Sequence, residues 1–363
     1  MSGTTFAGSG VSPIIKEDDM HSPQIESDPE SATAVRAAEI LVVIPTLNEE
    51  AHIETCLRSL MQGQPVLRDI PVIIADGGST DDTLEIAEQL QSAFKNLRVV
   101  HNPKRLQSAA VNLAAETGAT NQTRFLVRCD AHSIYPENFI VDVIAALKRV
   151  DAASLVVPMD AQGSTCFEKA NAWIVDTPLG SGGAAHRGGR RSGYVDHGHH
   201  AGFRLDAFRA VGGYDETFSH NEDAELDHRL TASGHRIYLN ADIRISYIPR
   251  SNLVALVRQY FRYGKGRARN VSKHGQQLKL RQALPILVLF ACVIGAGVAP
   301  LFAPAMLLPL GYLGLLVAAS VWMAIIKRSL CGLWCGVISG AMHMSWAIGF
   351  LVQRARGASG SPR

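Results

Sequence analysis

The sequence predicts an α/β domain built on a mainly parallel sheet, followed by helices that enter or cross a membrane. Short apolar runs alternate with helical runs through residues 39–252, a pattern typical of parallel strands joined by crossover helices. Charge divides the chain in the same way: 15 of the 35 basic residues and none of the 33 acidic residues lie after Asp242. An acidic globular body therefore precedes a basic, apolar tail.

Strands and helices are expected in turn along the first half of the body. The expected strands are Ile40–Ile44, Val72–Ala75, Leu97–Val100 and Phe125–Cys129, and the expected helices begin at Glu49, Ser79 and Gln107. Polar residues follow three of these strands, and each alone is an ordinary turn residue. Because parallel strands bring their carboxyl ends to one edge of a sheet, these polar residues together predict a ligand site there.

Residues 1–38 are rich in Ser, Pro, Thr and acidic residues and contain no apolar core. We expect a disordered segment rather than a secretory signal, so the domain at 39–252 is expected to stay in the cytoplasm. The cysteines lack paired-ligand spacing, and we expect all 6 to be reduced.

The tail contains the candidate membrane segments. Residues 283–326 carry no charged side chain and are long enough for two crossings, since about 20 apolar residues span a bilayer core. Leu330–Val352 is a third candidate, so the region 283–353 is expected to hold two or three helices. If Lys327 and Arg328 are cytoplasmic, a full third crossing would put the basic tail at 354–363 outside, against the positive-inside rule. The third segment is then re-entrant or interfacial, or the count is not three.

The linker at 253–282 carries eight Lys or Arg residues with aromatic residues among them. Directly before a membrane segment, such a run is typical of an interfacial helix held to anionic lipid headgroups. The positive charge is local, because the whole chain has a net charge of only +2. We therefore expect membrane lipid, and no nucleic acid, as a partner.

Five short motifs occur in an order that resembles family 2 glycosyltransferases. They are Val43–Glu49 (VIPTLNE), Ala75–Asp81 (ADGGSTD), Asp130–His132 (DAH), Asn221–Asp223 (NED) and Gln259–Tyr263 (QYFRY). The chain is most similar to bacterial exopolysaccharide glucosyltransferases of the succinoglycan type. This resemblance implies a GT-A fold, a Rossmann-like and mainly parallel sheet flanked by helices, and an inverting transfer from a nucleotide sugar, with UDP-glucose as the expected donor.

The resemblance also implies roles at the nucleotide. Four residues after the first strand are expected to line the nucleoside pocket: Pro45, Thr46, Asn48 and Glu49. Asp76 is expected to accept a hydrogen bond from uracil N3. Lys104 and Arg105 are expected at the phosphates or the base, and a solvated pair of charges is an equally good interpretation.

An inverting transfer needs a base for the acceptor hydroxyl and positive charge on the departing diphosphate. We expect Asp223 to be that base, because it opens a predicted helix whose dipole favours an ionised carboxylate. A helix cap without catalytic function is the alternative. Glu222 is expected to orient the site.

Asp130 and His132 are the expected metal ligands, and Asp130 is also expected to face the donor diphosphate. Residues at i and i+2 of an extended chain point the same way, so both side chains can face one ion. A divalent cation, Mn²⁺ or Mg²⁺, is the expected cofactor. Imidazole favours manganese, and direct contact of His132 with phosphate is the alternative.

Two further segments are expected at the acceptor. Thr177–Gly202 is rich in glycine and histidine, and we expect a flexible loop in which His199 and His200 touch the acceptor; a zinc site is the alternative. Gln259 and Arg262 belong to the last motif, where Tyr263 stands in place of the expected Trp. Arg262 is expected to bind a diphosphate, of the nucleotide or of a lipid carrier.

Together these features predict an enzyme anchored in a bacterial inner membrane with its catalytic domain in the cytoplasm. It would move a hexose onto a polyprenyl-diphosphate-linked saccharide in exopolysaccharide biosynthesis. Two alternatives stay open. The acceptor would be polyprenyl phosphate itself, or the chain would bind a lipid-linked sugar without catalysis.

Overall fold

The computed structural model describes residues 35–182 and 190–359. Most of the expected disordered segment at 1–38 lies outside the described residues. Part of the glycine-rich segment and the last four residues of the basic tail also lie outside them.

An eight-stranded sheet forms the centre of the catalytic domain, with strand order β3-β2-β1-β4-β9-β6-β10-β8. The strands are β1 (Ile40–Thr46), β2 (Val72–Asp76), β3 (Leu97–His101), β4 (Phe125–Arg128), β6 (Ser154–Val157), β8 (Gly193–Val195), β9 (His199–Arg204) and β10 (Ile237–Leu239). The first four run parallel, whereas β9 is antiparallel to both β4 and β6. The expected parallel half of the sheet is confirmed. A smaller sheet joins β5 (Ser133–Ile134), β11 (Ile245–Tyr247) and β7 (Met159–Ala161).

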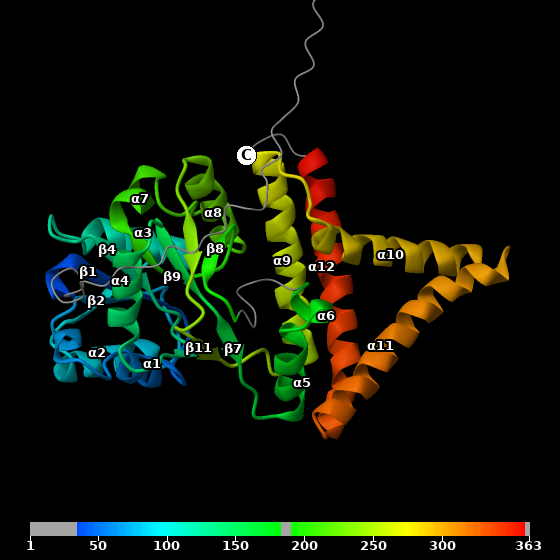
Figure 1. Cartoon of the computed structure of the whole chain (residues 1–363), viewed down its shortest axis with the longest axis horizontal. Helices are drawn as coiled ribbons and strands as arrows, with labels where there is room; N and C mark the ends of the chain where they lie inside the picture. The colour runs from blue at the N-terminus through cyan, green and yellow to red at the C-terminus, as the bar shows by residue number, and fades with distance from the viewer. Residues whose placement is uncertain (1–34, 183–189, 360–363) are drawn as a thin grey trace, which may run out of the picture. The chain divides into compact units, whose positions relative to one another are not determined.

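Helices cover both faces of the main sheet (Figure 1). Those of the catalytic domain are α1 (Ile53–Leu60), α2 (Thr83–Ala93), α3 (Gln107–Thr117), α4 (Phe139–Arg149), α5 (Cys166–Val175), α6 (Pro178–Ser181), α7 (Leu205–Ala210) and α8 (Glu222–Ala232). In β1, Ile40, Val42 and Ile44 pack with α1, α2 and α4, whereas Leu41 and Val43 pack with α3, α7 and α8. Both faces of β1 are therefore dry, which explains its unbroken apolar run.

The glycine-rich segment Thr177–Gly202 contains a central strand, so the prediction of one flexible loop is wrong for its C-terminal part. Strand β9 lies between β4 and β6. A Cβ atom added at Gly202 would lie 2.8 Å from Cγ1 of Val143, so only glycine lets α4 pack this closely. A close-packing requirement of this kind resembles loop composition in the sequence.

Four long helices follow the domain: α9 (Leu253–His274), α10 (Leu280–Val298), α11 (Leu307–Ile326) and α12 (Trp334–Ser359), with 3₁₀ turns at η4 (Ala303–Met306) and η5 (Leu330–Leu333). Within residues 35–182 and 190–359, three stretches are long and apolar enough to cross a membrane: Leu280–Val298, Ala303–Ile326 and Leu330–Gly357. Of the two or three membrane helices expected, three candidates are therefore found by length and composition. Helix α12 packs along α9, where a Cβ atom at Gly349 would lie 2.1 Å from the carbonyl oxygen of Phe261.

Cys166 and Cys331 form a disulfide, so the expectation that all six cysteines are reduced is wrong for this pair. The two residues are 165 positions apart, and packing of η5 against the start of α5 brings them together. Sequence spacing carries no sign of such a pairing. The other four cysteines are free thiols.

Candidate active site

Arg128 is the centre of a polar cluster at the carboxyl end of β4. Only 2% of its side chain is exposed, and its Nη1 donates to Oδ1 of Asp223 at 2.6 Å and to the Tyr214 hydroxyl at 2.9 Å. Tyr214 in turn donates to the same Asp223 oxygen at 2.7 Å. The guanidinium Nη2 lies 3.2 Å from Nδ1 of His199. One buried cation therefore connects β4 and β9 to the first turn of α8.

The expected catalytic pair opens α8, as predicted. Burial opposes ionisation of Asp223, but Arg128 and the neighbouring histidines outweigh it and lower the pKa of this carboxyl. Burial and the charge on Asp223 instead raise the pKa of Glu222 to about 7. Both hydrogen bonds described for the Asp223 carboxylate use Oδ1, so Oδ2 is the oxygen that an incoming hydroxyl would meet. Two adjacent carboxyls with separated pKa values are typical of acid–base sites.

Asp130 lies beside this pair at the end of β4. Its Oδ1 accepts from Nε2 of Gln107 at 3.0 Å, and its Oδ2 lies 3.6 Å from Nε2 of His199. Burial opposes its ionisation, but His199 and Arg128 lower its pKa, so the group is a carboxylate at neutral pH. The structure thus brings Asp130, Asp223 and His199 into one cluster.

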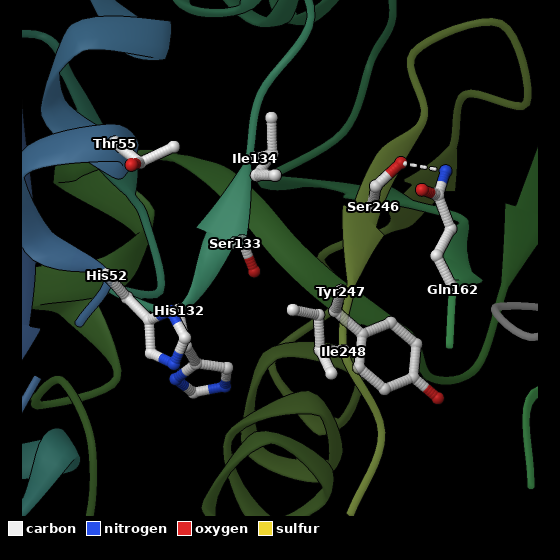
Figure 2. A pocket seen from close by; sticks show the side chains of 9 residues that line it. All are labelled: His52, Thr55, His132, Ser133, Ile134, Gln162, Ser246, Tyr247 and Ile248. Carbon is white, nitrogen blue, oxygen red and sulfur yellow. Dashed lines mark hydrogen bonds between the residues drawn. The ribbon is translucent and has the colours of Figure 1, made fainter. Parts of the chain in front are cut away.

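His132 points to a different neighbour. Its Nδ1 lies 3.1 Å from Oε1 of Glu49, and this hydrogen bond raises the pKa of His132. Residues His132 and Ser133 line one side of a pocket of about 80 Å³, with Tyr247 and Ile248 of the β11 segment across from them (Figure 2). The imidazole and the Asp130 carboxylate therefore have separate partners.

The residues expected to bind the nucleoside lie at the ends of β1 and β2. In this structure they form hydrogen bonds within and between the loops that follow these strands. The Asp76 carboxylate accepts from the backbone N–H groups of Gly78 and Ser79, at 2.8 and 3.0 Å, and from the Ser79 hydroxyl at 2.5 Å. Asp76 is 3% exposed, so a uracil would reach it only after this loop moves. Asn48, at a left-handed φ of 56°, accepts from the Thr80 N–H at 2.8 Å and joins the two loops.

The remaining residues expected at the nucleotide differ in accessibility. The Thr46 hydroxyl is buried and donates to the carbonyl oxygen of Ile44, while Pro45 is partly exposed. Lys104 pairs with Glu216. Arg105 is exposed, and its Nη2 lies 3.5 Å from the carbonyl oxygen of Gly78 on the Asp76 loop. Arg105 therefore lies beside the expected base pocket, and Lys104 is held by a protein carboxylate.

His200 does not face the cluster. Its ring is fully buried, with Nδ1 2.5 Å from the Ser154 hydroxyl and Nε2 2.9 Å from Oδ1 of Asp227. Neighbouring residues of a strand point to opposite faces, so His199 reaches the site and His200 packs against α8. The expectation that His200 touches an acceptor is not supported by this placement.

A basic cavity of about 430 Å³ lies between the start of α8 and helix α9. It is lined by Phe218, Ser219, His220, Arg262, Lys265, Gly266, Arg269 and Gln353. Asn221, next to the catalytic pair, donates from Nδ2 to the carbonyl oxygen of Tyr263 at 2.9 Å and so ties α8 to α9. Gln259 donates to the Tyr263 hydroxyl at 3.0 Å, which leaves Arg262 as the motif residue that reaches the cavity.

Arg128, Tyr214 and Gln107 belong to the cluster, and the sequence analysis did not select them. A signal existed for Arg128, because it is a charged residue in the otherwise apolar strand Phe125–Arg128. A buried charge needs a partner, and that partner is a site candidate. Tyr214 and Gln107 give no such signal, since their role depends on packing of distant segments.

The comparisons with known proteins agree with this geometry. Residues 41–212 match the model of glycosyl transferase family 2. The chain is 43% identical over 330 residues to the succinoglycan biosynthesis protein ExoA of Rhizobium meliloti (strain 1021), covering 88% of this chain and 96% of that protein. The chain belongs to glycosyl transferase family 2. It is therefore a glycosyltransferase of glycan biosynthesis.

A second relative and one solved structure share less of the sequence with this chain. A dolichyl-phosphate-linked sugar glucuronosyltransferase of Methanococcus voltae is 26% identical over 247 residues, covering 64% of this chain and 74% of that protein. The solved structure of a mannosyltransferase from Pyrobaculum calidifontis, in complex with GDP-mannose and Mn²⁺, aligns with a TM-score of 0.61 at 17% identity. The alignment covers 92% of this chain and 91% of that one. The predicted GT-A fold of this family 2 glycosyltransferase is confirmed.

Proposed function

We propose that this glycosyltransferase moves a hexose, with inversion, from UDP-glucose to a polyprenyl-diphosphate-linked saccharide in exopolysaccharide biosynthesis. The observation that carries the proposal is the Asp223 carboxylate, ionised and held by Arg128 and Tyr214 at the start of α8. It stands beside Asp130 at the edge where the parallel strands end. The relative from R. meliloti, named for succinoglycan biosynthesis, supports the choice of product.

Asp223 accepts the proton of the acceptor hydroxyl as the hydroxyl oxygen bonds to the anomeric carbon. The bond from that carbon to the diphosphate oxygen breaks, and its electron pair leaves with UDP. Glu222, whose pKa is about 7, orients the Asp223 side of the site. His199 and Gln107 hold the Asp130 carboxylate toward the diphosphate. General-base help of this kind contributes roughly 10²–10⁴ in rate.

The residues present fit a divalent cation bound mainly by the substrate. Among residues 35–182 and 190–359, no group of three His, Cys, Asp or Glu side chains forms a closed metal site. Mg²⁺ and Mn²⁺ sites of transferases need only one or two carboxylates, with phosphates and water completing the shell. Asp130 would supply that carboxylate, and His132 would lie at the edge of the cation site. The cation supplies positive charge to the leaving diphosphate.

At the nucleotide, Asp76 is the proposed uracil contact after its loop opens, with Pro45, Thr46, Asn48 and Glu49 forming the wall. Arg105 is placed to meet the donor more directly than Lys104, which pairs with Glu216. At the acceptor, Arg262 of the basic cavity binds the lipid-linked diphosphate, and Gln259 supports it through Tyr263. Two phosphate oxygens match one guanidinium.

The catalytic domain faces the cytoplasm of a bacterial inner membrane in this proposal. Nucleotide sugars are cytoplasmic substrates, and the basic helix α9 beside the apolar helices is typical of the inner surface of a membrane. The cavity that holds Arg262 opens next to this helix, so a lipid-linked acceptor can present its polar head to Asp223.

The test uses detergent-solubilised protein, a panel of radiolabelled nucleotide sugars, Mn²⁺ or Mg²⁺, and membrane lipid extract. Label from UDP-glucose should enter the organic phase, and Asp223→Asn should abolish this transfer while UDP affinity is retained. Asp242→Asn, at an exposed acidic residue, is the matched control. Transfer onto added polyprenyl phosphate alone would replace the proposed acceptor. Transfer at the wild-type rate by Asp223→Asn would refute Asp223 as the base.

A further inference from the structure

We propose that only the α10–α11 hairpin enters the hydrocarbon of the bilayer, and that α12 lies on the membrane surface beside the catalytic domain. In this arrangement the hairpin turn stays within lipid, and both ends of the hairpin and the C-terminus share one side. The inference rests on the membrane association proposed above. It does not depend on the catalytic roles of any residue.

The three candidate spans differ in what already covers them. Only 6% of the apolar window of α10 and 11% of that of the η4–α11 stretch are buried inside the protein, against 50% for the stretch that contains α12. Large apolar side chains project freely from the first two, with Val293 of α10 61% exposed and Leu307 of α11 70% exposed, and Leu301 in the turn between them is 92% exposed. An uncovered apolar surface of this size needs lipid, whereas half of the window that contains α12 is already buried, against α9 and α5 and also against α10 and α11.

Helix α12 is held by the rest of the protein along its whole length. Near its start, Sγ of Cys335 lies 3.6 Å from the carbonyl oxygen of Ala170 in α5. At its middle, Nε2 of His343 lies 2.8 Å from the carbonyl oxygen of Leu179 in α6. Near its end, Nη1 of Arg354 donates to the Ser272 hydroxyl of α9 at 2.8 Å. A crossing by α12 would therefore pull three parts of the polar domain into the bilayer.

The neighbour of α12 is unsuited to hydrocarbon. A Cβ atom at Gly264 of α9 would lie 2.0 Å from the carbonyl oxygen of Trp346 of α12, so the two backbones touch. Helix α9 carries Arg258, Arg262, Lys265, Arg267, Arg269 and Lys273. Charged side chains inside a bilayer are costly, and anionic headgroups at the surface attract them. The α9–α12 pair therefore fits the membrane surface and not its interior.

Both ends of the hairpin are fixed to the catalytic domain. Directly before α10, Nζ of Lys279 lies 2.7 Å from Oδ2 of Asp196. After α11, Nζ of Lys327 lies 5.7 Å from the ring centre of Trp173 in α5, and Cys331 is bonded to Cys166 of the same helix. A segment whose two ends meet the same domain must leave the bilayer on the side where it entered.

The turn between α10 and α11 is built for a surrounding without water. Backbone N–H groups of Leu301 and Phe302 both donate to the carbonyl oxygen of Val298 at 2.9 Å. Pro300 and Pro304 have no N–H group to satisfy. No charged or strongly polar side chain occurs between Ala299 and Met306. At 19 and 20 residues the helices are about 30 Å long, no longer than the bilayer core is thick, so a tilted hairpin places its turn inside the far leaflet.

This arrangement also removes the conflict in charge that three full crossings create. Lys327 and Arg328 then share one side of the membrane with Arg354 and Arg356 and with the basic helix α9. Short apolar segments insert so that the Lys and Arg residues that flank them stay on one side of the membrane, the cytoplasmic side.

Single-cysteine variants test the arrangement by labelling with a membrane-impermeant maleimide, in spheroplasts and in inside-out vesicles of cells that express the full chain. Each variant adds one cysteine to the six of the wild-type chain, and labelling of the wild-type chain, including Cys166 and Cys331 where they are reduced, sets the background. We expect Lys327→Cys and Arg354→Cys to react at least tenfold faster in inside-out vesicles than in spheroplasts. Leu301→Cys should stay at background in both and react only after detergent is added.

Reaction of Arg354→Cys in spheroplasts would show that α12 crosses the membrane and would overturn the proposal. Reaction of Leu301→Cys in either preparation without detergent would show that the turn reaches water and would equally overturn it. Labelling does not require transferase activity, so a failure of the proposed reaction leaves this test intact.

Discussion

Arg128 and Asp223 form a charged pair at 2.6 Å in which the guanidinium is almost wholly buried and the carboxylate is 19% exposed. The pair joins the last residue of β4 to the first turn of α8, segments that are 95 positions apart in the chain. It is therefore both a structural contact and the means by which the proposed base stays ionised.

Removal of the Arg128 guanidinium should lower the free energy of unfolding, because Asp223 loses its positive partner. Arg128→Met leaves Asp223 without its cation in a mostly buried place, and breaking such a pair destabilises by about 3–5 kcal/mol. Chemical unfolding of the solubilised protein measures this. The double variant Arg128→Met/Asp223→Asn should recover part of the loss, because no unpaired charge remains. If the stability loss of the double variant equalled the sum of the losses in the two single variants, Arg128 and Asp223 would not be directly coupled.

Glu222 should make stability depend on pH. Its pKa is raised from 4.5 to about 7, so the folded state binds more protons than the unfolded state between these values. The stability of the wild type should therefore fall as pH rises from 4.5 to 7, relative to Glu222→Gln. The total loss is on the order of 3 kcal/mol, at about 1.4 kcal/mol per pKa unit. Parallel stability curves for the two proteins would show that Glu222 does not titrate in this range.

Asp130 should set the metal requirement. Chelation with EDTA should abolish transfer, and added Mn²⁺ should restore it. Asp130→Asn should need at least tenfold more Mn²⁺ for half-maximal rate, because the substitution replaces the carboxylate proposed to hold the cation by an uncharged amide. Asp142→Asn, at an exposed acidic residue of α4, is the matched control and should titrate like the wild type. An unchanged metal titration in Asp130→Asn would remove this residue from the metal site.

His199 and His200 should separate activity from stability. His199→Ala removes a partner of Arg128 and Asp130, so transfer should fall while the unfolding midpoint changes little. His200→Ala leaves the Ser154 hydroxyl and Oδ1 of Asp227 buried without this partner, while His197 still contacts Oδ2, and should destabilise by about 1–3 kcal/mol. The KM for acceptor of folded His200→Ala should match the wild type. A raised KM there would return His200 to the acceptor site.

The Cys166–Cys331 pair should report the compartment. If the catalytic domain is cytoplasmic as proposed, the bond seen in the structure should form only after extraction into air, and packing of η5 against α5 should hold the two residues together without it. Rapid alkylation of intact cells, followed by a gel-shift assay, should trap two more modified thiols in the wild type than in the double Cys→Ser variant. A disulfide already present in cells would contradict a cytoplasmic catalytic domain.

The parallel half of the fold is readable in the sequence because its inner strands β1, β2 and β4 are buried on both faces. Ile40–Thr46 and Val72–Asp76 are continuous apolar runs, and the polar residues that follow them mark where each strand ends. The beginning of α8 is readable for a similar reason, since acidic residues collect at helix N-termini.

Strand β9 and the buried arginine are harder to predict. Glycine at 202 is required by the approach of α4, and a sequence shows only that a residue without β-propensity is present. The partners of Arg128 come from three other segments, each of which is placed by long-range packing. Local patterns therefore locate Asp130 and Asp223 separately but do not reveal the cation that joins them.

The irregular register in β9 has a consequence for how the chain tolerates change. His200 pairs with Val156 and Gly202 with Leu155, so one residue is extra in β9 at this point. A length change in this stretch that shifts both histidines by one position along the strand would turn each side chain to the opposite face. His200, which now contacts Asp227, would then point toward the Asp130 cluster. His199, which now contacts Asp130, would point into the interior. Length changes in this short stretch should therefore be far more damaging than substitutions there, even though its composition resembles that of a tolerant surface loop.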